Sequence, residues 1–444
     1  MVDDADGEGT GRRDAAPKPG STPARGLGPA FTNLFTASIA SNLGDGIART
    51  AIPLLAARLT DDALLIGGVA AMAMLPWLLC AIPAGILVDR IDRRTAMAMA
   101  NTVRGMLAAL LLVLSAGGTL TIVWLYVIIF LYGACETVYD GATRAVVPSI
   151  VGRVDLPRAN SRIEASELVV QNFLAGPFTS ALFAVSVLIP LGVNAVAFVI
   201  AAILAMLLPR VASGRQHAAA SASITGRAEA PWYRQFVDGY RFITRSRMLV
   251  TLWLVSTVGG MAFAIAMSSF VLFVLGPLGV PEAWFGVFML TGAVGGIIGT
   301  VVAAPLKKRL GAGLTMALAM LIGDGSLILV GVWPNVWVTA AVMALTSATI
   351  IIWNVLVMSL RQSIIPGHLL GRVHGTWRTL LWGATPIGSV IGGFIGRIDL
   401  ALPFIVGGAF SLVVTLVYFR FLAALPNAEE VPDPLGPNPL VPLS

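Results

Sequence analysis

The chain has 444 residues, of which 57% are hydrophobic and only 12% are charged, whereas soluble globular proteins carry about 25% charged residues. This composition excludes an ordinary soluble fold. The net charge of +6 does not indicate a nucleic-acid partner, because the basic residues lie in short tracts between long apolar runs, as in membrane proteins.

The two ends of the chain differ from the rest in composition. Residues 1–28 mix acidic and basic side chains and lack an apolar core, so we expect a disordered tail and not a signal peptide. Residues 426–444 are similarly polar and are repeatedly interrupted by proline. We expect them to form a second disordered tail in water.

Between the tails lie twelve apolar segments, each long enough for a membrane-spanning helix of about 20 residues. Each segment must be helical, because lipid offers no hydrogen-bond partner to the backbone and a helix satisfies its own groups. We place the segments at about 33–57, 63–88, 95–116, 120–142, 167–189, 191–208, 248–275, 284–304, 313–333, 335–358, 376–397 and 401–424.

Lysine and arginine are concentrated in alternate connections, those that follow the second, fourth, sixth, eighth and tenth segments. The other connections hold essentially Arg58, with Arg397 at a helix edge. Because positively charged loops stay on the cytoplasmic side, we expect a multi-pass protein of the inner (plasma) membrane with both termini in the cytoplasm.

The longest connection, 209–247, divides the chain into two sets of six segments, 29–208 and 248–425. Its second part, 232–243, has aromatic residues at helical spacing with arginines between them. This pattern predicts an amphipathic helix on the inner membrane surface. An ordinary segment that precedes the next helix, without a role of its own, is the alternative.

Charged residues within the apolar segments point to a functional site, because each is costly at the bilayer centre. Asp45 and Arg49 are four residues apart, so they share one face of the first helix and can neutralise each other. Asp45 lies roughly 18 Å from the start of this helix, near the midplane where a proton or substrate site is expected.

In the fourth segment, Glu136, Asp140 and Arg144 follow the same four-residue spacing. A buried carboxyl near a guanidinium is subject to opposing influences on its pKa and can exchange a proton. We hypothesise that Asp45 or Glu136 carries a coupling proton and that Arg49 or Arg104 modulates it. A structural ion-pair network that only joins helices is the alternative.

The connection after the second segment reads Gly85-Ile86-Leu87-Val88-Asp89-Arg90-Ile91-Asp92-Arg93-Arg94. It resembles the signature of the major facilitator superfamily, G-x-L-x-D-R-x-G-R-R/K, with Asp92 in place of the second glycine. Aspartate also tolerates turn geometry. The resemblance covers nearly the whole chain and implies an all-α integral membrane fold of twelve helices in two pseudo-symmetric six-helix bundles.

The same resemblance implies a charge-linked latch that closes the cytoplasmic side of a transporter. Its parts are Gly85, Asp89 and the loop arginines Arg90, Arg93 and Arg94, together with Asp140 and Arg144 of the fourth segment. We expect Asp140 to meet Arg93 or Arg90. In the alternative interpretation, these arginines only fix the topology.

Shorter motifs are similar to those of drug and siderophore exporters, a branch that includes macrolide efflux and enterobactin export proteins. They are Gly44-Asp45-Gly46, residues 155–161, and Asn194-Ala195 with Phe198. In the fifth segment, Gly176-Pro177 begins a partial match to the G-P-x-x-G-G element of proton-driven exporters. Pro177 removes one helical hydrogen bond and permits a bend, and a packing kink without a part in coupling is the alternative.

By resemblance, the second, fifth, eighth and eleventh helices join the two halves, and the first, fourth, seventh and tenth line a substrate cavity. Glycines at four-residue spacing, Gly292, Gly295, Gly296, Gly299, Gly388, Gly392 and Gly396, would let helices slide in close contact. The cavity residues would be Asn42, Trp253, Phe263, Met267, Trp353, Asn354 and Met358, and Arg378 with His374 could receive an anionic group or merely mark the inner edge.

Nothing in the sequence indicates an enzyme. A nucleotide-binding P-loop and a metal-binding histidine motif are both missing from the sequence, so we expect no cofactor, no metal and no ATP-driven pumping. We predict a monomeric secondary transporter that exports a small amphipathic or hydrophobic compound in exchange for protons. The rivals are uptake or facilitated diffusion of a nutrient or lipid-like molecule, and a non-transporting receptor on the same scaffold.

Overall fold

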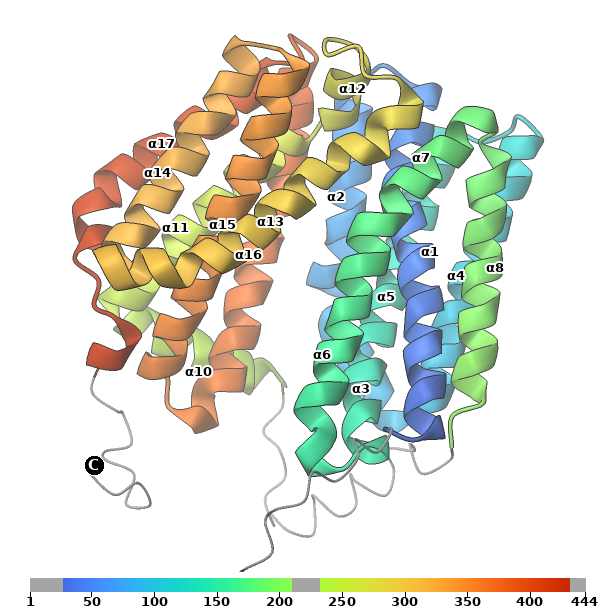
Figure 1. The fold of residues 1–444 in the computed structure, drawn as a ribbon, viewed down its shortest axis with the longest axis horizontal. Coiled ribbons are helices and arrows are strands. Elements are labelled where there is room, and N and C mark those ends of the chain that lie inside the picture. Colours follow the sequence, from blue (N-terminus) through green and yellow to red (C-terminus); the bar gives the residue numbers. More distant parts are fainter. Residues whose placement is uncertain (1–26, 210–231, 432–444) are drawn as a thin grey trace, which may run out of the picture.

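A computed structural model describes residues 27–209 and 232–431. Residues 1–26, 210–231 and 432–444, which include most of both predicted tails, lie outside the described part. The described residues form α-helices with short 3-10 and π segments and contain no β-strand. The helices run mostly side by side in two groups (Figure 1).

The first group, called the N-terminal half, ends before the undescribed central segment. Its helices are α1 (Pro29–Leu59), α2 (Ala63–Leu79), α3 (Ala81–Arg90), α4 (Arg93–Ala116), α5 (Ile122–Ile150), α6 (Leu156–Ser166), the π segment η2 (Glu167–Leu174), α7 (Ala175–Val185) and α8 (Leu188–Met206). The short 3-10 turn η1 (Arg153–Asp155) precedes α6.

The second group, called the C-terminal half, begins with a helix that precedes the seventh span. It comprises α10 (Trp232–Arg245), α11 (Arg247–Met267), α12 (Phe270–Leu275), α13 (Glu282–Leu310), α14 (Ala312–Val332), α15 (Val336–Ile364), α16 (Gly367–Gly396), α17 (Leu402–Ala423) and the 3-10 turn η4 (Ala428–Glu430).

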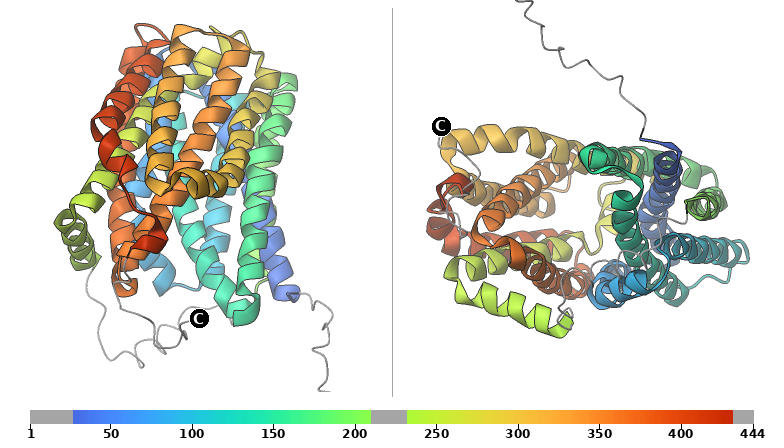
Figure 2. Two further views of the ribbon diagram at one scale, coloured as in Figure 1. Left: turned by 60° about the vertical axis from the view of Figure 1, so that its left-hand side comes forward. Right: turned by 90° about the horizontal axis from the view of Figure 1, so that it is seen from below.

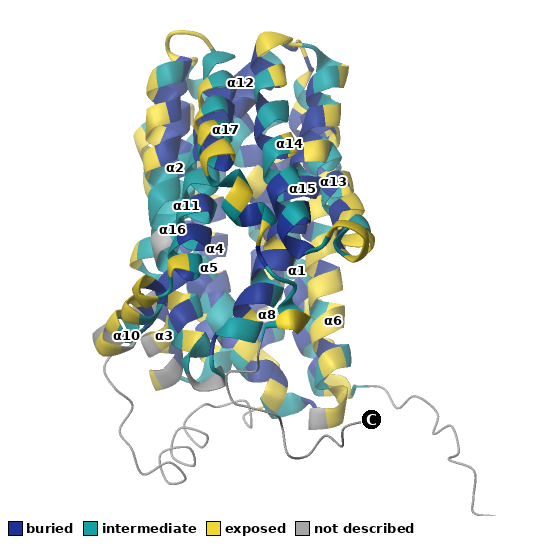
Figure 3. Cartoon of the chain, turned by 90° about the vertical axis from the view of Figure 1, so that its left-hand side faces the viewer, coloured by how far each residue is buried: buried dark blue, intermediate teal, exposed yellow. Residues whose placement is uncertain are grey.

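The predicted all-helical membrane fold with twelve spans is confirmed. Ten helical stretches of the described chain are long and apolar enough to cross a membrane. The other two spans are α1, with 31 residues, and the pair α2–α3, which is interrupted at Cys80. Large apolar side chains such as Val301 on α13 and Val417 on α17 are exposed, and Figure 3 shows exposed residues along the outward faces of the helices. These faces are suited to contact lipid.

Two helices begin well before the predicted segments. The fifth span starts at Leu156 and not near 167, and the eleventh starts at Gly367 and not near 376. Both predictions stopped at polar or charged residues, because apolar content was the criterion for a span. These residues continue the helices beyond the apolar stretch.

The described parts of the chain begin and end at one end of the bundle, at residues 27, 209, 232 and 431. We call it the tail end (lower end in Figure 1). The connections around Asp62, Pro281 and Asp399 lie at the other end, here called the far end. The two halves approach each other at the far end and diverge toward the tail end (Figure 1).

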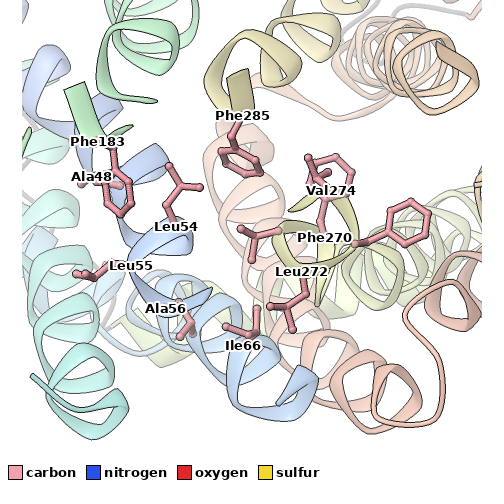
Figure 4. Close-up of a cluster of buried hydrophobic side chains, with 14 of the residues drawn as sticks. Ala48, Leu54, Leu55, Ala56, Ile66, Phe183, Phe270, Leu272, Val274 and Phe285 are labelled. Carbon is pink, nitrogen blue, oxygen red and sulfur yellow. The ribbon is translucent and has the colours of Figure 1, made fainter. Parts of the chain in front are cut away.

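The buried apolar side chains explain this shape. One cluster at the far end draws on both halves, including Leu54, Ile66 and Phe183 from one and Phe270 and Phe285 from the other (Figure 4). Two further clusters each belong to a single half: residues between 31 and 208 form one, and residues between 243 and 425 form the other. The halves therefore share a core at the far end and have separate cores toward the tail end.

The predicted amphipathic helix is present as α10, at the tail end beside α16 (Figure 2). Gly239 packs so closely on α16 that an added Cβ would overlap Thr376 and the Arg372 carbonyl. Arg372 also pairs with Asp238 at 3.2 Å, and the Thr376 hydroxyl donates to the Phe236 carbonyl at 3.2 Å. The helix is thus docked on the C-terminal half through one face.

Candidate functional site

A buried ion pair lies inside the N-terminal half. Arg104 of α4 has no exposed surface, and its Nη1 donates to Asp45 Oδ1 of α1 at 2.7 Å. Its Nη2 donates to Ser41 Oγ at 2.9 Å and to Asn101 Oδ1 at 2.6 Å. Because a buried charge is costly unless it is paired and hydrogen-bonded, these partners allow Arg104 to remain charged in the interior.

Aromatic rings complete the surroundings of Arg104. Its Cζ lies 4.6 Å from the ring centre of Phe198, 4.9 Å from that of Tyr139 and 5.7 Å from that of Tyr132. At such distances the negative face of an aromatic ring attracts a cation. The guanidinium is therefore held both by acceptors and by rings of α5 and α8.

The exporter-like motif residues gather around this pair. Asn194 donates from Nδ2 to the Gly44 carbonyl at 2.6 Å. An added Cβ on Gly44 would contact the Phe198 ring at 2.5–2.9 Å, and one on Gly46 would overlap Ala175. The two glycines flanking Asp45 thus let α1 approach α8 and α7 closely, which brings Asp45 to Arg104.

A second, looser ion pair joins Arg49 and Glu136. Arg49 Nη2 lies 3.6 Å from Glu136 Oε1, and 58% of the Arg49 side chain and 19% of the Glu136 side chain are exposed. With its amide oxygen turned toward α1, Gln171 accepts from Arg49 Nη2 at 3.1 Å and from Nε at 3.2 Å. The Glu136 carboxylate is therefore less enclosed than that of Asp45, of whose side chain 8% is exposed.

The structure brings together all four residues of the proton-coupling hypothesis, but in different pairs. Asp45 and Arg49 do not neutralise each other: Asp45 binds Arg104 on α4 and Arg49 binds Glu136 on α5. Helical spacing places two residues on one side of a helix, whereas the neighbouring helices decide which partner each one meets.

The predicted latch loop has a different set of contacts from those expected. Arg93 Nη1 donates to the Ala145 carbonyl at 2.7 Å, and Arg94 Nη1 donates to the Leu208 carbonyl at 3.1 Å. The expected pair of Asp140 with Arg93 or Arg90 is not among the ion pairs of residues 27–209 and 232–431. Asp140 precedes Ala145, the residue that Arg93 contacts, by about 7.5 Å along the axis of α5.

The other latch residues are distributed around this loop. Asp92 caps α4, since its Oδ1 accepts from the Arg94 backbone N–H at 3.0 Å, so the residue that departs from the superfamily signature begins the next helix. Gly85 and Arg90 are exposed on α3, and Arg144 is exposed on α5. Asp89 lies in α3, and its side chain is outside the described part of the structure.

Gly176 lies where the two halves cross. An added Cβ on Gly286 of α13 would overlap the Gly176 carbonyl of α7, and the Gly286 N–H donates to Ser180 Oγ at 3.1 Å. The π segment Glu167–Leu174 directly precedes α7. Pro177 has no N–H to give to the Phe173 carbonyl, so the fifth span is irregular just before this crossing.

Most of the predicted glycines lie at contacts within the C-terminal half, whereas Gly396 lies between the halves, where an added Cβ would be 2.9 Å from the Ala63 side chain of α2. Gly295 and Gly299 pack on Ala344 and Ala348 of α15, and Gly392 packs on Ile265 of α11, all within the C-terminal half. The contact of α2 with α16 uses Gly67 against Ser389 and Gly393 against Leu64. The spacing correctly indicated close helix contacts, and the helices that the resemblance placed between the halves do meet there: α2 packs on α16 and α7 packs on α13.

Two ion pairs join the halves at the far end. Arg58 of α1 donates from Nε at 3.0 Å and from Nη2 at 2.5 Å to the Glu282 carboxylate of α13. Arg397 donates from Nε at 2.7 Å and from Nη2 at 2.6 Å to the Asp62 carboxylate, which precedes α2. Arg58 and Arg397 are the basic residues that the charge distribution of the sequence places on this side, but their acidic partners were not predicted.

The predicted cavity residues do not form one group. Trp353 is buried in the C-terminal core and donates from Nε1 to Ser256 Oγ at 3.3 Å, so it acts as a packing residue. Trp253 packs against the same core, whereas Phe263 and Met267 pack against the far-end cluster. Of the remaining residues, Asn354 is exposed, Met358 is half-buried, and Asn42 donates to Ser166 Oγ at 3.4 Å.

A cationic group lies at the tail end, and only part of it was predicted from the sequence. Arg361 of α15 is buried at 5% exposure, and its Nη2 lies 3.4 Å from His374 Nδ1 of α16. Arg378, one turn further along α16, is half-buried with its Cζ 5.8 Å from the Trp77 ring of α2. Arg378 and His374 were candidates for an anion site from the sequence, whereas the burial of Arg361 beside them is seen only in the structure.

The fold and the charged residues buried in its spans are those of a membrane transporter, and solved structures share the fold. A bacterial homologue of the iron transporter ferroportin in an inward-facing state matches with a TM-score of 0.70 at 16% identity, covering 90% of this chain and 100% of that chain. The nucleoside transporter NupG matches with a TM-score of 0.66 at 12% identity, covering 90% of this chain and 100% of that chain.

Residues 23–443 match the model of the transmembrane secretion effector family, and the chain belongs to this family of the major facilitator superfamily. It is 26% identical over 431 residues to the multidrug efflux pump Tap of Mycobacterium tuberculosis, covering 92% of this chain and 98% of the relative, and to that of Mycobacterium bovis with the same values. The chain is therefore a multi-pass membrane transporter and not an enzyme.

Proposed function

We propose that this transporter exports small amphipathic or hydrophobic compounds from the cell in exchange for protons, by alternating access. The observation that carries the proposal is the contrast between its two ends. A shared apolar core and two ion pairs close the far end, whereas the cores of the two halves are separate toward the tail end. A carrier that opens to one side at a time needs this asymmetry.

The tail end faces the cytoplasm in this proposal. The helix ends and connections there carry Arg90, Arg93, Arg94, Arg241 and Arg309, whereas the far-end connections carry Arg58 and Arg397, both paired with acids. Positively charged connections remain on the cytoplasmic side of a membrane. The bundle would then be open toward the cell interior, where an exporter collects its substrate.

Glu136 is the residue that we assign to proton coupling. It is partly exposed and only loosely paired with Arg49, so it can reach water and can lose its partner at low cost. Asp45 is buried and is held at 2.7 Å by an Arg104 with several other partners. In this assignment the Asp45–Arg104 pair holds α1 against α4, and the hypothesis narrows to Glu136 with Arg49 as its partner.

The direction of transport rests on the relatives. The Tap proteins, which match over nearly their whole length, are multidrug efflux pumps. The compound class follows from the same source and from the exporter-like motifs around Asp45. We expect the protein to act as a monomer in the plasma membrane, without a cofactor.

The test uses inside-out membrane vesicles with an imposed pH gradient and two amphipathic dyes, the cation ethidium and the anion carboxyfluorescein. Accumulation of either dye that collapses when a protonophore removes the gradient is the expected result. Glu136→Gln should abolish this gradient dependence, while Glu164→Gln, which changes an exposed glutamate of α6, should leave it intact. Accumulation in intact cells instead would favour uptake.

A further inference from the structure

Arg361 is a buried cation that has no acidic partner among residues 27–209 and 232–431. It lies in the last turn of α15 with 5% of its surface exposed, and its Cζ stacks 4.0 Å from the centre of the Trp377 ring. Its Nε has no hydrogen-bond partner among the described residues. Burial of a charge is unfavourable unless a counter-charge is nearby, so the arrangement lacks an anion.

His374 accepts a hydrogen bond from Arg361 and presents a donor of its own toward the space between the halves. Arg361 Nη2 lies 3.4 Å from His374 Nδ1. A guanidinium is always a donor, so Nδ1 accepts and the proton of the neutral ring is on Nε2. The half-buried imidazole therefore presents an N–H donor on the side away from Arg361.

Arg378 supplies a second donor from the same helix face. Positions 374 and 378 are four residues apart on α16, so their side chains are neighbours. Arg378 reaches across to Trp77 of α2 at 5.8 Å, and it lies close enough to Asp140 and Arg144 of α5 to interact with their charges. The group thus lies where the two halves face each other.

The charges in this region do not balance. In the part of the chain that the structure describes, the charged side chains that act on His374 are Arg361, Arg378 and Arg144, all cationic, and Asp140 is the acid that acts on Arg378. Even if Asp140 neutralises one arginine, two positive charges remain. The negative end of α15 attracts Arg361 weakly, but it is too far along another helix to compensate Arg378.

We propose that His374 and Arg378, backed by the buried Arg361, form a binding site for a carboxylate or phosphate group of the transported compound. Paired N–H donors from cationic side chains bind such groups strongly. The neighbouring ring of Trp77, which is half-buried, would lie beside the apolar part of an amphipathic anion. This inference rests on the proposed function and specifies its substrate class as amphipathic anions.

The experiment measures binding to the purified full-length protein in zwitterionic nanodiscs, without a pH gradient. The probes are benzoate and its neutral isostere benzamide, with phenyl phosphate as a second anion, and the readouts are calorimetric titration and thermal unfolding. We expect saturable binding of both anions and binding of benzamide that is weaker by roughly ten-fold or more, as for the loss of a charged hydrogen bond.

Variants then test the site. Arg378→Gln, at a half-buried position, should weaken benzoate binding by roughly ten-fold, and Arg361→Lys, which retains the charge but cannot stack as a planar group, should weaken it less. The matched control is Arg372→Gln, which removes an arginine of the same helix that pairs with Asp238. It should leave benzoate binding unchanged.

Equal binding of benzoate and benzamide, or benzoate binding that survives Arg378→Gln, would overturn the inference. So would stabilisation that depends on Arg378 only in nanodiscs containing phosphatidylglycerol, because the occupant would then be a lipid headgroup. The assay is independent of transport. If transport of the dyes does not depend on the pH gradient while benzoate and phenyl phosphate still bind at Arg378, the proposed proton coupling is wrong and the anion site is retained.

Discussion

Asp62 and Arg397, which belong to different halves of the chain, form a two-point ion pair with distances of 2.7 and 2.6 Å. The same carboxylate caps α2, since Asp62 Oδ1 accepts from the Leu64 N–H at 2.9 Å. Arg58 and Glu282 make a similar two-point contact nearby. These pairs reinforce the apolar core that the halves share at this end.

Removal of both pairs should open the far end. In the double variant Asp62→Asn with Glu282→Gln, we expect a larger fraction of molecules with separated far ends, because two charge-assisted contacts no longer oppose separation. Spin labels at positions 123 and 337, where Val123 is 64% and Trp337 is 81% exposed, would report the distance between the halves. Cys80 and Cys135 would first be replaced by serine.

The matched control is Lys307 with Glu429, an ion pair within the C-terminal half. Glu429→Gln should leave the label distance unchanged. Exchange of the charges, Asp62→Arg with Arg397→Asp, should restore most of the closed population. An unaltered distance distribution in the double variant would show that the apolar cluster alone closes this end.

The far end should stay closed over the physiological pH range. Hydrogen bonds from Arg397 lower the pKa of the Asp62 carboxyl from 3.8 to about 2. A lowered pKa means that the contribution of the pair is fully present above the ordinary value and is lost as pH falls through about 2. The same label pair should therefore give one distance distribution from about pH 8 to about pH 5, and an Asp62-dependent opening within that range would contradict this assignment.

The crossing of α7 and α13 depends on the absence of a side chain. Gly286→Ala places a methyl group against the Gly176 backbone, so the helices must separate, at a cost of roughly 1–3 kcal/mol for overpacking. We expect a lower unfolding temperature and reduced flux. Gly325→Ala is the control, since nothing lies within 4 Å of a Cβ there and alanine favours a helix. Equal unfolding temperatures for the two variants would argue against a tight crossing.

The sequence predicts the number and approximate position of the spans because lipid imposes the same demand on each one: a long apolar helix. The sequence predicts less well which charged side chains pair with each other. Arg49 was the expected partner of Asp45 because it lies one turn away, whereas the actual partner, Arg104, is 59 residues distant on another helix. The rotation of each helix about its axis, which decides such contacts, depends on packing against several neighbours.

The glycines illustrate the same limit. The spacing of Gly295 and Gly299 indicates that a backbone approaches closely, and it does, but the partner is α15 in the same half. The crossing between halves uses Gly286 with Gly176, which are single small residues on two helices. The resemblance predicted that the fifth and eighth helices meet, but a single glycine carries no periodic signal, so this pair of residues could not be predicted from the spacing.

The Asp45–Arg104 pair should behave as a strongly coupled buried unit. Either Asp45→Asn or Arg104→Met alone leaves a buried group without its partner, and we expect each to cost roughly 3–5 kcal/mol of unfolding free energy. The double variant should cost less than the sum, with a coupling energy on the order of 2 kcal/mol. A double-mutant cycle measures this coupling. It compares the thermal unfolding of the unchanged protein, the two single variants and the double variant in detergent, followed by tryptophan fluorescence.

An exposed pair calibrates this measurement. Lys307→Met and Glu429→Gln interrupt a pair in which 70% of the Glu429 side chain is exposed, and surface pairs couple by less than about 1 kcal/mol. Additive effects at Asp45 and Arg104, no larger than those of the surface pair, would mean that Ser41, Asn101 and the surrounding rings hold Arg104 without Asp45. In that case Asp45 would not be committed to this ion pair, and the assignment of coupling to Glu136 would lose its main argument.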